Sequence, residues 1–353
     1  MKDTGRFLEA VVCLWLACGS MALACQIPVF RYALERWEAE PYVVIVFHRG
    51  AMGAAEQRAV DLLKGAEKSI ANIKMQLVDL AGSVDEPMRK MWEGQAGAAL
   101  PWMMVRYPGG DEEVPGVWAG RLNVEAAEQV IDSPARREIV RRIAGGESAV
   151  WVLLESGDKG RDDSAAQVLS DELGKALKDM ALPDMEAEPD GPRLLSELPL
   201  KLAFSVLRVS RANPGERFLV SMLVKSDREV GGVPPAIAYP VFGRGRVLGG
   251  LMMEGARGEQ IAQGARFICG ACSCQVKAMN PGFDMLLAAD WQNILDGGKL
   301  REPAMGVPDS AAGLRGVEEV GAVPVSWTVV LGVGAALVLL FGYLAWRSRP
   351  KMG

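Results

Sequence analysis

The sequence has one histidine and lacks the motifs by which many enzymes are recognised. No G-x-x-x-x-G-K-[ST], H-E-x-x-H or G-x-S-x-G occurs, which excludes the easily recognised NTPases, zinc proteases and serine hydrolases. The single histidine, His48, follows a predicted strand. A catalytic role would require a nearby nucleophile or carboxylate, and the sequence identifies none, so a solvent-facing loop histidine is the simpler interpretation.

A basic excess is also missing. The chain has 39 Lys and Arg against 44 Asp and Glu, a formal net charge of -5, and the two signs are interspersed. Phosphate binding requires a basic face, so nucleic acid is not an expected partner. The acidic runs 111–113 and 162–163 lack the ligand spacing of calcium sites, and we interpret them as solvated turns.

Long apolar runs are confined to the two ends of the chain. At the N-terminus, Lys2 and Arg6 precede an apolar run over 10–24 that ends in small residues, which predicts a cleaved signal peptide over residues 1–24. A run of about 15 residues is too short to span a membrane. Cleavage would leave Cys25 first, and residues 21–25 resemble a bacterial lipobox, so Cys25 is a candidate for lipidation or for a disulfide.

The C-terminal run predicts a transmembrane helix. Residues 325–346 contain no charge, and as a helix they would be about 33 Å long, enough to cross a bilayer. By the positive-inside rule, the basic tail 347–353 would lie in the cytoplasm and the body outside, in the periplasm. The predicted membrane anchor residues are Trp327, Tyr343, Trp346, Arg347 and Arg349.

Between these ends, composition predicts two α/β modules and a tether. The first module covers 25–147 and the second 148–291, and the segment 292–324, rich in Gly and Pro, is typical of a flexible tether. Within them, the apolar runs 42–47 and 149–154 predict strands buried on both faces.

Helical patterns follow each of these predicted strands. The first is 54–63 and the second is 164–180, where Ser164 and Gln167 predict a capping box at the helix start. Ser133 and Pro134 predict the start of a further helix.

Two further stretches resemble each other. Residues 100–120 and 234–250 each read as a proline, an apolar strand, a glycine turn and a second strand, with helix-compatible sequence after them. The glycines of 243–249 connect two strands, which indicates a hairpin rather than a dinucleotide loop.

This order of elements resembles the thioredoxin-like fold, in which strand, helix, strand and helix are followed by a proline, usually cis, a β-hairpin and a last helix. The resemblance covers about 40–145 and again about 148–272, and implies an α/β body of two tandem thioredoxin-like modules. A general mixed-sheet α/β body is the alternative. Thioredoxins carry C-x-x-C where the first strand meets the first helix, but 48–53 and 156–160 contain no cysteine, so the resemblance implies binding or scaffolding rather than dithiol chemistry.

The cysteine cluster CGACSC is the most reactive sequence feature of the body. Three interpretations remain open for Cys269, Cys272 and Cys274: structural disulfides, one of them to Cys25; a redox pair of Cys269 and Cys272; or a thiolate-bound metal held by all three. Cys269 to Cys272 resembles the thioredoxin motif, but too little chain follows to build that fold downstream. No histidine follows Cys272, which excludes c-type haem attachment.

The segment 31–37 (RYALERW) places aromatic residues beside charges on a short predicted helix. Core packing is the simpler interpretation, and docking to a membrane partner is the alternative.

These observations predict a single-pass membrane protein whose exported body acts in the cell envelope as a non-enzymatic binding or assembly component, with other envelope membrane proteins as partners. The alternative is an extracytoplasmic thiol-disulfide or metal-handling protein that uses the cluster. No cofactor is expected apart from the metal of that alternative.

Overall fold

The computed structural model describes residues 25–109, 116–186, 192–226, 235–272, 276–297 and 318–320, and for Cys25 and 318–320 the backbone alone. The predicted signal peptide, Cys274, the predicted transmembrane helix with its anchor residues and the basic tail lie outside these residues. Within them, no helix is long and apolar enough to cross a membrane.

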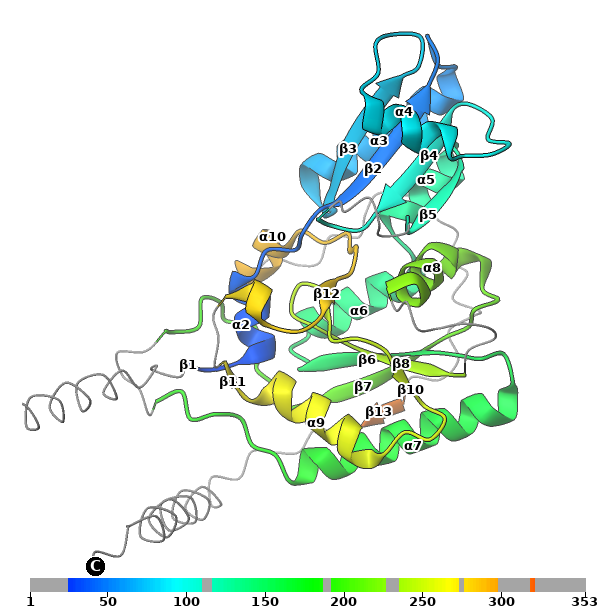
Figure 1. Cartoon of the computed structure of the whole chain (residues 1–353). Coiled ribbons are helices and arrows are strands. Elements are labelled where there is room, and N and C mark those ends of the chain that lie inside the picture. The colour runs from blue at the N-terminus through cyan, green and yellow to red at the C-terminus, as the bar shows by residue number, and fades with distance from the viewer. Residues whose placement is uncertain are drawn as a thin grey trace, which may run out of the picture. The chain divides into compact units, whose positions relative to one another are not determined.

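The fold is mixed α/β, and the first of its two large sheets has four strands in the order β3-β2-β4-β5 (Figure 1). Strand β2 runs parallel to β3 and antiparallel to β4, which pairs antiparallel with β5. The strands are β2 (Tyr42–His48), β3 (Ile73–Asp79), β4 (Trp102–Arg106) and β5 (Trp118–Arg121). The helices are α3 (Ala54–Ser69), α4 (Glu86–Glu93) and α5 (Val124–Ile131).

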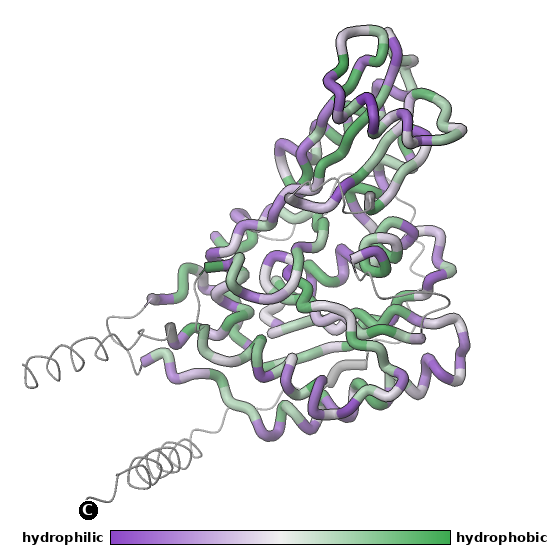
Figure 2. The backbone as a smooth tube through the Cα atoms, in the orientation of Figure 1, coloured by the Kyte–Doolittle hydropathy of each residue, from purple (hydrophilic) through white to green (hydrophobic). Residues whose placement is uncertain are grey.

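Successive side chains of β2 point to opposite faces of this sheet, and helices cover both faces. Val44 and Val46 face the core that α3 and α5 share, whereas Ile45 and Phe47 face the side of α4. Because both faces are covered, the strand reads as a continuous apolar run, and it is hydrophobic over most of its length in Figure 2.

The second sheet has seven strands, in the order β12-β9-β8-β6-β7-β13 with β10 also paired to β8. Strand β6 runs parallel to β7 and antiparallel to β8, and β8 pairs antiparallel with β9. The strands are β6 (Ala149–Leu154), β7 (Phe204–Val209), β8 (Ile237–Phe242), β9 (Arg246–Val247), β10 (Leu251–Met252), β12 (Phe283–Asp284) and β13 (Glu318–Val320). Strand β13 lies within the segment predicted to be a tether and pairs with β7.

Helices cover both faces of the second sheet, and all six residues of β6 are buried. One face packs against α7 (Lys159–Lys178) and α9 (Gly258–Cys269), and the other against α6 (Pro134–Ala144) and α8 (Arg217–Ser226) (Figure 1). A single 3-10 turn, η1 (Pro214–Glu216), precedes α8, and a second, η2 (Lys277–Met279), precedes β12.

Both ends of the described body pack across the predicted boundary at 147/148. The N-terminal β1 (Cys25–Pro28) pairs with β11 (Ala271–Cys272), and α2 (Val29–Arg36) packs in the α7–α9 core of the second sheet. The segment 285–295, with α10 (Trp291–Leu295), returns to the first sheet. There Ala288 forms a bridge with Ala71, and the Ala289 amide donates to the Ile70 carbonyl at 2.8 Å.

The side chains of RYALERW confirm the core interpretation. Tyr32 and Trp37 are buried in the α7–α9 core and meet edge to face with ring centres 6.2 Å apart. The charges of this helix are also used within the chain, because Arg31 and Glu35 form a buried ion pair at 2.7 Å.

Two sequence predictions about helix α7 are wrong. The helix begins at Lys159 rather than Ser164, because the Asp158 carboxylate caps it by accepting from the Arg161 amide at 3.0 Å. The run 162–163 is not a solvated turn: both residues lie in the first turns of α7, and Asp162 is buried. The prediction that a helix begins at Pro134 is confirmed, although Glu216, rather than Ser133, accepts from the Ala135 amide at 2.8 Å.

Candidate functional site

The first place where catalysis would be expected is the corner between β2 and α3, which holds His48. His48 Nδ1 lies 2.9 Å from the Gly50 carbonyl, and its register partner on β3 is Asp79. Asp79 Oδ1 accepts from the Gly50 amide at 3.0 Å and the Ala81 amide at 2.9 Å. These backbone hydrogen bonds, that of Gly50 first, lower the pKa of Asp79 below its ordinary value. The carboxylate therefore joins the loop between β2 and α3 to the loop after β3.

The strand that begins the hairpin lies beside this corner. Trp102 on β4 is the register partner of Phe47, so the cis peptide bond between Leu100 and Pro101 is at the same end of the sheet as His48.

The second corner, between β6 and α7, is closed in the same way. Asp162 Oδ1 accepts from the Ser156 amide at 2.7 Å and the Ser156 hydroxyl at 2.8 Å, and Oδ2 accepts from the Gly157 amide at 3.0 Å. Backbone amides at the start of a helix are the usual donors to a bound anion or a thiolate. Here the Asp162 carboxylate of the chain itself occupies two amides, in the loop just before the helix, and one hydroxyl.

The cysteine cluster begins at the end of α9. Cys269 is 1% exposed and packs in the α7–α9 core, where burial raises the pKa of its thiol to about 12, opposed by a hydrogen bond with Ser148. Cys272 is also 1% exposed and lies on β11 opposite Cys25. Cys274 falls outside the described residues, and within them no three cysteine, histidine or acidic side chains lie close enough to hold a metal ion.

We expect the Cys269 thiol to resist alkylation in the folded protein. A buried thiol with a raised pKa forms little thiolate, and the thiolate is the reactive species. In a variant with Cys25, Cys272 and Cys274 replaced by serine, maleimide should label Cys269 at least about 100-fold more slowly in buffer than in denaturing urea. Comparable labelling rates, measured by mass spectrometry, would show that the thiol is accessible.

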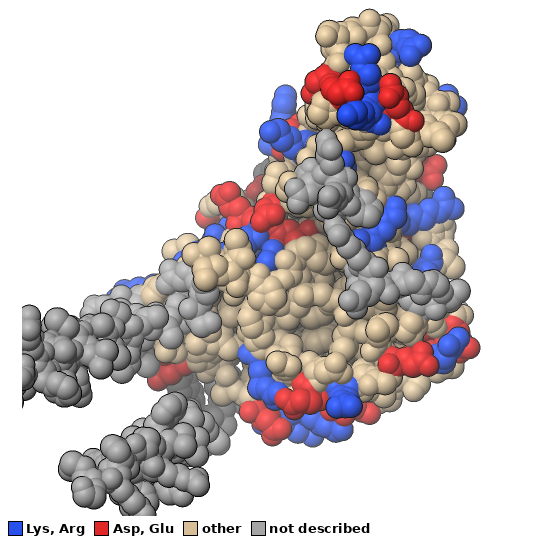
Figure 3. All heavy atoms as spheres, viewed as in Figure 1, with Lys and Arg blue, Asp and Glu red and all other residues tan. Residues whose placement is uncertain are grey.

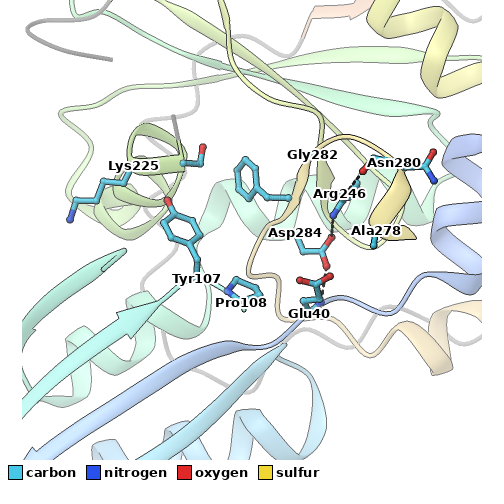
Figure 4. Close-up of a pocket in the computed structure, with 11 residues that line it drawn as sticks. Glu40, Tyr107, Pro108, Lys225, Arg246, Ala278, Asn280, Gly282 and Asp284 are labelled. Carbon is cyan, nitrogen blue, oxygen red and sulfur yellow. Dashed lines mark hydrogen bonds and ion pairs between the residues drawn. The ribbon is translucent and has the colours of Figure 1, made fainter. Parts of the chain in front are cut away.

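A cavity of about 370 Å³ lies between the first sheet and the end of the second (Figure 4). It has the size of a site for a small ligand or a single side chain. Its lining comes from segments far apart in the sequence: Glu40, Tyr107, Pro108, Lys225, Ser226, Arg246, Ala278, Asn280, Gly282, Phe283 and Asp284.

Asp284 is the centre of the ionic groups at this cavity. Its Oδ1 pairs with Arg246 Nη1 at 3.2 Å, and its Oδ2 accepts from the Glu40 amide at 2.7 Å and pairs with Lys277. Lys277 also lies 3.4 Å from the Glu40 carboxylate, and the Tyr42 hydroxyl donates to the Asp284 carbonyl at 2.7 Å. These groups fix the start of β2 to β9 and β12.

The other polar groups of the lining are likewise engaged with the chain. The Tyr107 hydroxyl donates to the Met222 carbonyl at 2.6 Å, and burial raises the pKa of this phenol well above its ordinary value. Lys225 Nζ donates to the Gly116 and Val117 carbonyls at 3.2 and 3.0 Å, and burial lowers its pKa. The Tyr107 phenol therefore stays protonated near neutral pH, and both groups donate to carbonyls of the chain.

The cavity lining is mixed, with aromatic rings lying among charged, amide and hydroxyl groups. The rings of Tyr107 and Phe283 meet edge to face with centres 6.2 Å apart, next to Pro108 and Gly282. These rings can bind an apolar group of a ligand whose polar groups face the other part of the lining. Sequence reasoning missed the cavity because it interpreted the segment around Arg246 only as a hairpin and gave the other lining segments no common location.

On the face of the molecule shown in Figure 3, basic and acidic side chains lie next to one another, and neither sign forms an extended patch. The chain matches no protein-family model, no curated protein and no solved structure.

Proposed function

We propose that the chain is a membrane-anchored binding or assembly protein of the cell envelope, whose exported body consists of two tandem thioredoxin-like modules without dithiol chemistry. The single observation that carries this proposal is the closure of both strand-helix corners by carboxylates of the chain. At the corners where a thioredoxin has its cysteines, Asp79 accepts from the Gly50 amide and Asp162 accepts from the Ser156 and Gly157 amides.

The strand order supports the tandem interpretation. The orders β3-β2-β4-β5 and β7-β6-β8-β9 are equivalent, each with a parallel first pair followed by two antiparallel pairs. In each set a helix connects the parallel pair, α3 in the first and α7 in the second, and a helix follows the hairpin, α5 in the first and α9 in the second. This is the order that the thioredoxin-like resemblance implies.

The location rests on the sequence. The uncharged run 325–346 and the basic residues after it predict a single-pass anchor with a cytoplasmic tail, and the segment 1–24 predicts export. An exported body whose cavity combines aromatic rings with ionic groups already engaged with the chain is suited to binding rather than to reaction. We propose other membrane proteins of the envelope as its partners.

The alternative, exchange or metal chemistry at the cluster, is less favoured. A redox pair of Cys269 and Cys272 needs an accessible low-pKa thiol, and Cys269 is buried with a raised pKa.

Crosslinking in intact cells tests the proposal. A membrane-impermeant amine-reactive reagent should join exposed lysines of the body, such as Lys68 and Lys74, to the same one or few envelope membrane proteins in every preparation. A Cys269→Ala variant should give the same crosslinks, and the purified protein should not catalyse reduction of a substrate disulfide. Reagent access only after permeabilisation would contradict the location, and catalysis that the Cys269→Ala variant loses would establish the alternative.

A further inference from the structure

The first residues of the body form a small ladder with the cysteine cluster. Strands β1 and β11 are antiparallel, with Cys25 opposite Cys272 and Pro28 opposite Ala271. The register shifts between these two pairs, and the Val29 amide donates to the Gly270 carbonyl at 2.9 Å immediately beyond the Pro28 pair.

This register places two cysteine backbones at a distance that a disulfide can bridge. Directly opposed residues of an antiparallel pair have Cα atoms about 4.5 or 5.5 Å apart. Disulfides join Cα atoms about 4.4–6.8 Å apart. Cys25 and Cys272 therefore meet the distance requirement without movement of the backbone.

The packing also selects Cys272 from the cluster. Cys269 ends α9 and its thiol has a hydrogen bond with Ser148, which precedes β6, so it belongs to the junction of α9 with the second sheet. Cys272 lies on the strand that contacts the N-terminus, and it is buried in one core with Ile27 and Val29. A bond at this position would lie beneath packed side chains rather than on the surface.

We propose that Cys25 and Cys272 form a structural disulfide that fastens the N-terminus of the body to the second sheet. The bond forms by thiol-disulfide exchange with a disulfide-carrying protein of the compartment to which the body is exported. The thiolate of one cysteine attacks the donor disulfide, which forms a mixed disulfide with one donor sulfur and releases the other donor sulfur as a thiolate. The second cysteine thiolate then attacks the mixed disulfide and displaces the bound donor sulfur. Cys25 and Cys272 lose two electrons and two protons, and the donor leaves as a dithiol.

The bond has a consequence for the N-terminus. A sulfur in a disulfide cannot carry a lipid, so the proposal assigns Cys25 to the disulfide and excludes its acylation. The proposal does not depend on the binding function, because the bond requires only the ladder and an oxidant.

Peptide mapping of the full chain, purified in detergent with free thiols blocked, tests the bond. Trypsin cuts after Arg31, Arg266 and Lys277, so Cys25 lies in a peptide ending at Arg31 and the whole cluster lies in peptide 267–277. Without reductant, mass spectrometry should find these two peptides linked, and reduction should separate them.

Three variants identify the partner sulfur. Cys272→Ser should abolish the linked pair, whereas Cys269→Ser and Cys274→Ser should leave it. A link that persists in Cys272→Ser and disappears in Cys274→Ser would overturn the assignment. A lipid on Cys25 would overturn the bond itself, and so would a Cys25 thiol that stays free after the same purified protein is equilibrated with an oxidising glutathione buffer.

Discussion

Replacement of Arg136 by alanine is expected to lower the free energy of unfolding by about 3–5 kcal/mol, the cost typical of removing one partner from a buried charged network. Arg136 is fully buried in helix α6. Its guanidinium donates to the carbonyls of Gln129, Val130 and Leu286 and to the Ser133 hydroxyl, at 2.5 to 3.3 Å. The variant would leave these buried acceptors without their donor, and each costs about 1–3 kcal/mol when unsatisfied.

The surroundings of Arg136 add to the loss. Its guanidinium carbon lies 5.1 Å from the centre of the Phe218 ring. Burial raises the pKa of Glu216 above its ordinary value, and the positive charge of Arg136 is one of the interactions that oppose this rise. Glu216 Oε2 has no hydrogen-bond partner among the described residues, so this carboxylate depends on the nearby cation. Without Arg136, the buried Glu216 carboxylate would lose the nearby positive charge that stabilises its ionised form.

Urea unfolding followed by circular dichroism measures this effect, and Arg141 on the same helix provides the control. Arg141 is 63% exposed and pairs with Glu138, so Arg141→Ala should change stability by less than about 1 kcal/mol. Equal midpoints for Arg136→Ala and Arg141→Ala would show that the buried hydrogen bonds are not formed.

Replacement of Glu35 by alanine should be comparably destabilising, by about 3–5 kcal/mol. Its Oε1 pairs with Arg31 at 2.7 Å and accepts from the Ser196 amide and hydroxyl, both at 3.1 Å. Its Oε2 accepts from the Leu195 amide at 2.8 Å and pairs with Arg36 at 3.1 Å. The variant would leave Arg31 as a buried cation without its carboxylate and remove the acceptor of the Leu195 and Ser196 amides.

Two measurements test whether Glu35 anchors the segment that contains Ser196. The unfolding free energy of Glu35→Ala should fall, and trypsin should cut after the exposed Arg193 faster than in the wild type, because only Arg31 and Arg36 would still hold that segment to α2. Glu38→Ala, an exposed position after the same helix, should behave as wild type within about 0.5 kcal/mol. An unchanged cleavage rate in Glu35→Ala would contradict the role of the carboxylate as the anchor of the segment.

Local sequence signals predicted the strands well. The runs 42–47 and 149–154 are β2 and β6, because a strand covered on both faces must be apolar throughout. The hairpin at 243–249 was also predicted from its glycines, and Gly243 and Gly245 adopt positive φ there. Glycine turns and apolar runs act over a few residues, so one sequence is enough to locate them.

Contacts between distant segments could not be predicted in this way. Arg31, Glu35 and Arg136 lie at positions on short helices where charges are normally solvated, and only the tertiary fold shows them to be buried. The cavity has the same origin, since Glu40, Tyr107 and Asp284 come together only when the two sheets are assembled. The start of α7 was misplaced because Asp158 is an equally good cap in a polar loop, and sequence does not rank the two.

The two ends of the described body each pack against the sheet of the other module, and this affects how the chain folds during synthesis. Helix α2 is synthesised among the first described residues, yet the core that receives it is complete only with α9, more than 200 residues later. The first sheet likewise awaits residues 285–295. Such non-local contacts form slowly, so a growing polypeptide should remain without its final structure, and open to chaperones, until nearly its whole length has emerged.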